Sequence, residues 1–210
     1  MNVELEQLFK EFTGGLILSS TKMPFVRGNK FFDHSIDQDN GIYSVTIRDT
    51  ELTPILTDLF NIESLTGINI QGRISRKFRL ERKLDNLIAV SISNTGLGNE
   101  IYNIVKNFSN LRLLDLSLNL INHIPNQLSN LNLLNTLVLS NNKISTVGDN
   151  LNLENLEVLD LSNNKLSEIP EFIFNSEKIH SLNISGNKFK LNFDVYNNRR
   201  QIVELLNLPL

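Results

Sequence analysis

One short pattern of leucines returns along this chain at a nearly fixed spacing, and it constrains the possible folds more than any other feature. The segment 156–170 reads LEVLDLSNNKLSEIP, which fits the frame L-x-x-L-x-L-x-x-N-x-L. The same frame begins again at Leu111, Leu134 and Ile179, in steps of about 22 to 23 residues. Four consecutive copies in one register predict a stack of similar coils that share a single apolar interior.

Weaker copies of the frame occupy the first half of the chain. They cover residues 42–52, 65–73 and 87–97, and residues 15–18 give a fainter match to a first strand. Thr50, Arg73 and Thr95 stand where the later copies have asparagine. Between the first two copies, residues 24–41 read as a looped insertion, whose acids lack the spacing of an EF-hand calcium loop. We therefore expect irregular coils before residue 111 and no metal site.

The frame also predicts which side chains face inward. Its second and third apolar positions flank one residue, so on a short strand they point into the core and the residue between them points out. Stacked coils then pair these strands in parallel. The frame asparagines are expected to lie buried, where their amides satisfy backbone groups of neighbouring coils. These structural asparagines are Asn119, Asn142, Asn164 and Asn187.

The repeated frame resembles the leucine-rich repeat family, strongly over residues 111–189 and loosely over 16–97. The resemblance implies an α/β fold: a curved right-handed solenoid of about seven to eight repeats of 22–24 residues, with a parallel sheet on its concave face. An amphipathic pattern at 1–13 and another at 194–210 predict capping helices at the two ends. Between them lies a repeat domain at 14–193, irregular over 14–110 and regular over 111–193.

The composition bears on where the protein is located and on which class of partner it binds. The chain has no cysteine, no N-terminal pattern of a secretory signal and no apolar run long enough for a membrane span. We expect a cytoplasmic monomer. The formal net charge of −3 gives no global attraction to nucleic acid, which disfavours that partner.

Candidate contact residues are the individual side chains that point out of the strands, because core packing does not determine them. The resemblance implies protein recognition through the concave face. The residues expected to contact a protein partner are Arg48, Asp49, Glu51, Asn69, Gln71, Ser93, Asp115, Leu118, Val138 and Asp160. Two further stripes, the serines that follow the strands and Lys143, Lys165 and Lys188, are favoured as ordinary filler of this repeat pattern.

The one dense run of charge, RISRKFRLERK at 73–83, offers an alternative surface for an acidic partner, a phosphate-rich surface or nucleic acid. Its basic residues are Arg73, Arg76, Lys77, Arg79, Arg82 and Lys83. A solvated outer face anchored by neighbouring apolar residues is the favoured interpretation. The sequence carries no nucleotide-binding, zinc-binding or nucleophile motif, so we expect no catalytic residues, no metal and no cofactor.

Overall fold

The computed structural model describes residues 31–36, 43–49, 56, 60 and 65–189 of the chain. For 31–36 and 43–49 it gives the course of the backbone. The expected capping helices at 1–13 and 194–210, the faint strand at 15–18 and the contact residue Glu51 lie outside the described residues. For Arg48 and Asp49 only the backbone position is described.

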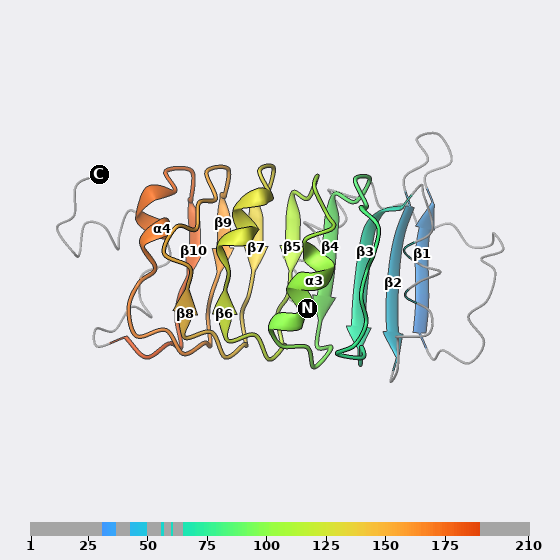
Figure 1. Cartoon of the computed structure of the whole chain (residues 1–210), viewed down its shortest axis with the longest axis horizontal. Coiled ribbons are helices and arrows are strands. Elements are labelled where there is room, and N and C mark those ends of the chain that lie inside the picture. The colour runs from blue at the N-terminus through green and yellow to red at the C-terminus, as the bar shows by residue number, and fades with distance from the viewer. Residues whose placement is uncertain (1–30, 37–42, 50–55, 57–59, 61–64, 190–210) are drawn as a thin grey trace.

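The described chain is built on one eight-stranded sheet that runs along the whole molecule (Figure 1). Its order is β1-β2-β3-β4-β5-β7-β9-β10, and every pairing from β2 onward is parallel. These strands are β2 (Tyr43–Asp49), β3 (Leu65–Gly72), β4 (Ala89–Ser93), β5 (Leu113–Asp115), β7 (Thr136–Val138), β9 (Val158–Asp160) and β10 (Ser181–Asn183). Each strand therefore opens one coil of a solenoid.

The register of the sheet follows the sequence frame. Leu114 pairs with Leu137, Leu137 with Leu159, and Leu159 with Leu182, so equivalent frame positions meet across each pair of strands. These leucines are fully buried and belong to one continuous apolar cluster that extends through all the described coils. Because one coil alone could not bury its own leucines, the stack itself forms the core.

Short irregular segments complete each coil on the side opposite the long sheet. They are η1 (Asn99–Ile101), α3 (Tyr102–Val105), η2 (Asn126–Asn130) and α4 (Glu171–Asn175), with a two-stranded parallel sheet of β6 (His123–Ile124) and β8 (Thr146–Val147). In Figure 1 these segments lie in front of the main sheet. Pro125 and Pro170 occupy the N-cap positions of η2 and α4, where proline's missing N–H is not needed.

One strand of the eight-stranded sheet was not expected. β1 (Phe31–Ile36) pairs antiparallel with β2, from Phe31 opposite Arg48 to Ile36 opposite Tyr43. It lies inside the segment 24–41, so the prediction of a loop is wrong for residues 31–36. Aromatic and β-branched residues favour extended structure, and the hairpin pairs an edge of β2 that would otherwise be open.

Asparagine side chains connect consecutive coils. The amide of Asn142 donates to the carbonyls of Leu116 in the preceding coil (2.9 Å) and Leu139 in its own coil (3.0 Å). Its side-chain oxygen accepts from the backbone N–H of Ile121 (3.0 Å). Asn119, Asn164 and Asn187 make the same three kinds of contact.

The first described coils depart from this ladder. Thr95 is buried and its hydroxyl donates to the side-chain oxygen of Asn119 (2.7 Å), so threonine keeps part of the asparagine's role. Arg73, at the equivalent place after β3, is exposed. The residue before it, Gly72, has φ 142°, whereas the matching residues of later coils have φ between 52° and 66°. The turn after β3 therefore differs in backbone geometry, because arginine cannot take the buried amide's place.

Candidate interaction surface

Two residues of each strand from β3 to β10 lie on the face of the sheet away from the core. From β3 to β10 the first row is Gly67, Ala89, Leu113, Thr136, Val158 and Ser181, and the second row is Asn69, Ser91, Asp115, Val138, Asp160 and Asn183. Ala89, Leu113 and Val138 are buried but do not belong to the main apolar cluster. We call these two rows the concave rows.

Exposure of the concave rows changes along the molecule. Over β3, β4, β5 and β7 both rows are buried, with Leu113 at 0%, Asp115 at 1% and Val138 at 3% exposure. Over β9, Val158 and Asp160 are half-buried, and over β10 both outward residues are exposed. The open part of the concave rows is therefore the end formed by β9 and β10.

The expectation that the outward residues are open to solvent is wrong for Asn69, Ser93, Asp115 and Val138, all of which are buried. Strand alternation determines the face from which a side chain leaves, but it does not determine whether that face is covered. Gln71 is half-buried, as Asp160 is. A role of these residues in partner contact stays a prediction.

Asp115 shows what enclosure does to a concave residue. Its carboxylate accepts from the hydroxyl of Ser91 (2.9 Å) on the adjacent strand and from the backbone N–H of Ser117 (2.9 Å). Burial raises the pKa of Asp115 above its usual value, and the hydrogen bonds from Ser117 and Ser91 oppose that shift. The carboxyl group is thus already committed to contacts within the fold.

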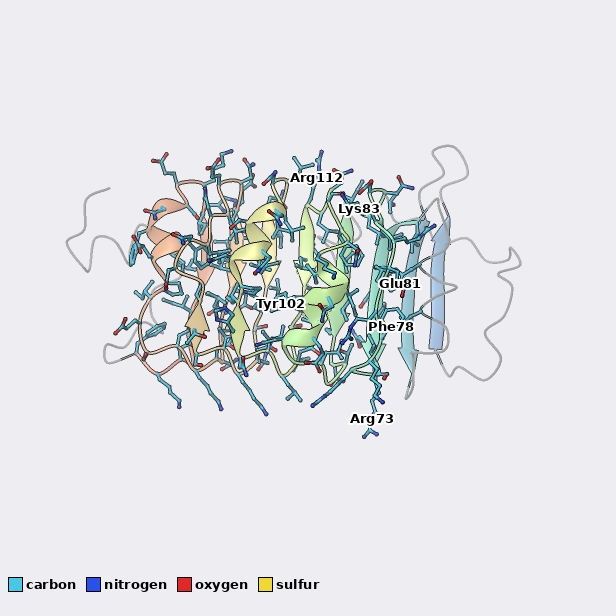
Figure 2. All side chains as sticks on the ribbon, viewed as in Figure 1. Arg73, Phe78, Glu81, Lys83, Tyr102 and Arg112 are labelled. Carbon is cyan, nitrogen blue, oxygen red and sulfur yellow. The ribbon has the colours of Figure 1, made fainter. Side chains whose placement is uncertain are left out.

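A second open surface is the edge of the sheet at the carboxyl ends of the strands. At each turn after β4, β5, β7, β9 and β10 the residue at the same frame position has positive φ: Asn94, Leu118, Asn141, Asn163 and Gly186. Two residues later in the frame stand Gly96, Leu120, Lys143, Lys165 and Lys188. Figure 2 shows long side chains with nitrogen tips along this lower edge, where Arg73 is labelled.

The coil of β5 is the exception along this edge. Leu118 has φ 57° and is 49% exposed, where the other coils have asparagine or glycine. Leu120 is 36% exposed, where the later coils have lysine. Leu118 was among the expected contact residues. Leu120 was not, although its departure from the lysine stripe was visible in the sequence.

The basic segment 73–83 lies on the outside of the coil that follows β3. Ile74, Leu80 and Leu84 are buried, and Phe78 stacks on Phe60 with ring centroids 6.3 Å apart, so the segment is anchored to the core. Figure 2 places Phe78, Glu81 and Lys83 along it. All six basic side chains are exposed.

Three of these basic side chains already have partners in the fold. Arg76 pairs with Glu100 (3.2 Å), Arg79 donates to the carbonyls of Arg76 and Phe78 (2.8 Å each), and Arg82 donates to the carbonyl of Phe60 (2.8 Å). The side chains of Arg73, Lys77 and Lys83 have no such partner among the described residues. Only half of the basic run is therefore available to an outside ligand.

Next to this segment, on the same outer side of the coils, a cavity of about 310 Å³ lies between α3 and η2. Its lining includes Tyr102, Phe108 and Leu128, with Lys83 and Lys106. The Tyr102 hydroxyl is buried and has no hydrogen-bond partner in the described part of the chain, and burial raises its pKa. The burial of the Tyr102 hydroxyl could not be predicted from the sequence, because it depends on how two neighbouring coils pack together.

The described histidines and acids are dispersed over the coils. Within the described ranges, no group of three or more His, Cys, Asp or Glu residues is placed to hold a metal ion. His180 lies 3.8 Å from Glu157, and both side chains are exposed. No described helix has the length and apolar character needed to cross a membrane.

Comparison with known proteins gives the following similarities. Residues 155–176 match the family model described as Leucine Rich Repeat. No curated protein sequence matches the chain. Among solved structures, the plant peptide hormone receptor RGFR1 in complex with RGF2 is similar at 22% identity and a TM-score of 0.47, over 66% of this chain and 24% of the receptor chain.

Two further structures are similar in the same range. The ectodomain of the receptor kinase SOBIR1 from Arabidopsis thaliana has 25% identity and a TM-score of 0.42, over 89% of this chain and 92% of that one. A leucine-rich repeat protein of Leptospira interrogans has 20% identity and a TM-score of 0.48, over 71% and 43%. The chain thus spans less than half the length of two of the three.

Proposed function

We propose that the chain, whose repeat frame resembles the leucine-rich repeat pattern and whose residues 155–176 match that family's model, is a non-enzymatic module that binds a protein partner through the open part of its concave rows. Val158, Asp160, Ser181 and Asn183 leave a rigid ladder, and core packing does not determine their identity. The observation that carries this proposal is that Ser181 and Asn183 are exposed and Val158 and Asp160 are half-buried, whereas the concave rows over β3, β4, β5 and β7 are buried. A cytoplasmic location and a monomeric state, expected from the sequence, remain part of it.

Rigid strands are suited to recognition because little conformational entropy is lost on binding. Val158 and Asp160 pair in register with Ser181 and Asn183, so the four side chains form a fixed two-by-two array. Asp160 is held in place because its carboxylate accepts from the backbone N–H of Ser162 (2.9 Å). A partner with donor groups opposite this carboxylate would find it already oriented.

The test compares two acidic positions with different surroundings. The immobilised chain is used to capture proteins from its native source, and affinity for the purified partner is then measured by calorimetry. Asp160→Lys should lower the affinity at least about tenfold, as loss of a central interface contact does. Asp149→Lys, an exposed aspartate on the far side of the coils, is the matched control and should bind as the wild type does. Equal affinity of both variants would refute the proposal.

A second candidate function is electrostatic docking of an acidic partner on the basic segment 73–83. It is favoured by the three exposed cations that have no partner among the described residues, Arg73, Lys77 and Lys83. Affinity should then fall steeply as salt is added, and Lys77→Glu with Lys83→Glu should abolish capture. Binding that is insensitive to salt would remove this candidate.

A further inference from the structure

The carboxyl-end edge of the sheet carries an unusual combination of strain, apolar exposure and positive charge. We define the carboxyl rim as the exposed residues at this edge: Arg73, Leu118, Leu120, Lys143, Lys165 and Lys188. It is separate from the concave rows, because its residues follow the strands and do not lie on them.

The first observation is the backbone at Leu118. Its φ of 57° lies in the left-handed region, which asparagine and glycine adopt far more readily than leucine. The equivalent residues Asn94, Asn141, Asn163 and Gly186 obey this preference. Backbone hydrogen bonds from Leu118 to Ser140 (3.0 Å) and from Leu120 to Leu97 (2.7 Å) hold the conformation. The turn after β5 therefore contains a leucine in a left-handed backbone conformation that disfavours leucine.

The second observation is that Leu118 does not belong to the apolar core. Leu118 is 49% exposed and Leu120 is 36% exposed, two residues apart on the same turn. An exposed apolar pair at a position that costs stability is typical of a contact that is made with another molecule. Folding alone would favour asparagine at 118, as in the neighbouring coils.

The third observation is charge. Lys143, Lys165 and Lys188 take the frame position of Leu120 in the three later coils, and Arg73 follows β3, two strands before β5 in the sheet. Figure 2 labels Arg73 on this edge. None of these four cations has an ion pair among the described residues. Of the acids in the turns at this edge, Glu100 is paired with Arg76 (3.2 Å), and Glu168 stands three residues after Lys165. The rim is thus locally basic on a chain whose net charge is −3.

We propose that the carboxyl rim binds an extended acidic peptide segment of a protein partner, with an apolar side chain of that segment seated against Leu118 and Leu120. Neighbouring coils are about 4.8 Å apart, so the rim from Arg73 to Lys188 is about 24 Å long. An extended segment rises about 3.3 Å per residue, so about seven residues would span it. The proposal rests on the proposed function only in taking the chain to be a protein-binding module, and it adds a second surface and the chemistry of its ligand.

The test uses the full chain and a fluorescein-labelled synthetic peptide of about ten residues, with a central Leu-Phe pair flanked by glutamates, in a fluorescence anisotropy titration. We expect saturable binding that a peptide with a Ser-Ser centre, or with lysine flanks, does not show. Leu118→Asn restores the residue of the neighbouring coils, so it should raise the melting temperature while lowering the affinity for the Leu-Phe peptide at least about fivefold.

Leu133→Asn is the matched control. Leu133 is 48% exposed, but it precedes β7 and so lies at the opposite edge of the sheet. It should leave the affinity for the peptide unchanged. Absence of peptide binding, equal affinity of the two variants, or equal binding of the Ser-Ser peptide would each overturn the proposal. The proposal would also be overturned if a single-stranded oligonucleotide displaced the peptide and bound the wild type and Leu118→Asn equally well.

The outcome separates this inference from the proposed function. If capture of the native partner depends on Asp160 but not on Leu118, docking at the carboxyl rim is wrong and protein recognition by the concave rows stands. If Leu118→Asn weakens peptide binding while Asp160→Lys leaves capture intact, the rim is a binding surface and the concave rows are not.

Discussion

Single asparagines connect the coils, and they are the residues whose position was most predictable. The frame requires a small side chain that both donates and accepts at its ninth position, because backbone groups of two coils meet there. Asn142 provides all three hydrogen bonds at once. The sequence could predict this because the need is local and repeats with the coil.

Asn142→Ala should therefore lower the free energy of unfolding by at least about 2 kcal/mol, since each buried polar group left unpaired costs about 1–3 kcal/mol. Urea denaturation followed by circular dichroism measures the change. Asn132→Ala is the control, because the Asn132 side chain is exposed and only its backbone carbonyl accepts a hydrogen bond, from Asn155 (2.7 Å). A similar loss of stability in both variants would contradict the conclusion that the Asn142 side chain stabilises the contact between consecutive coils.

Asp115 gives a prediction about pH. Burial raises its pKa in the folded chain, so the native state binds this proton more tightly than the unfolded state. Its contribution to stability is then greatest below the ordinary aspartate pKa, near 4, and is lost as pH rises through the raised pKa. Asp115→Asn should be more stable than the wild type at pH 7, and the difference in melting temperature should shrink toward pH 4. A difference that grows as pH falls would show that the buried carboxylate is stabilising.

At the scale of elements, the repeat pattern predicted the parallel strands after residue 65 and their register, because core leucines must meet across neighbouring coils. It could not predict β1, because pairing with β2 depends on an edge that no single segment encodes. Nor could it predict that the side chains of Leu113 and Asp115 are buried. Alternation along a strand assigns a side chain to a face, but only the assembled fold determines whether that face is open.

Packing between α3 and the next coil leads to a prediction of its own. The Tyr102 hydroxyl is buried without a partner among the described residues, while its ring packs on the apolar cluster. Tyr102→Phe keeps the ring and removes the polar atom, so it should raise the free energy of unfolding by up to about 1–2 kcal/mol. Thermal denaturation of Tyr102→Phe and the wild type measures this. A clear loss of stability would mean that the hydroxyl makes a hydrogen bond that stabilises the fold.

At the scale of the whole molecule, the coils form one ladder whose two long surfaces differ in what they offer a partner. The concave rows over β9 and β10 and the carboxyl rim present side chains that the core does not need. The basic segment 73–83, on the outside of the coils, uses half of its cations within the fold. The repeat pattern predicted the architecture. Choosing between these surfaces required knowing which outward side chains of each coil are buried and which are exposed.

Lysine labelling with mass spectrometry distinguishes the carboxyl rim from the basic segment 73–83 most directly, because lysines lie on both of these surfaces. The chain is labelled with and without its captured partner, and the extent of modification is compared at Lys143, Lys165 and Lys188 and at Lys77 and Lys83, all of which are exposed in the free chain. We predict that the partner protects the first three lysines and leaves Lys77 and Lys83 unchanged. Protection of Lys77 and Lys83 with the other three still fully labelled would contradict the account.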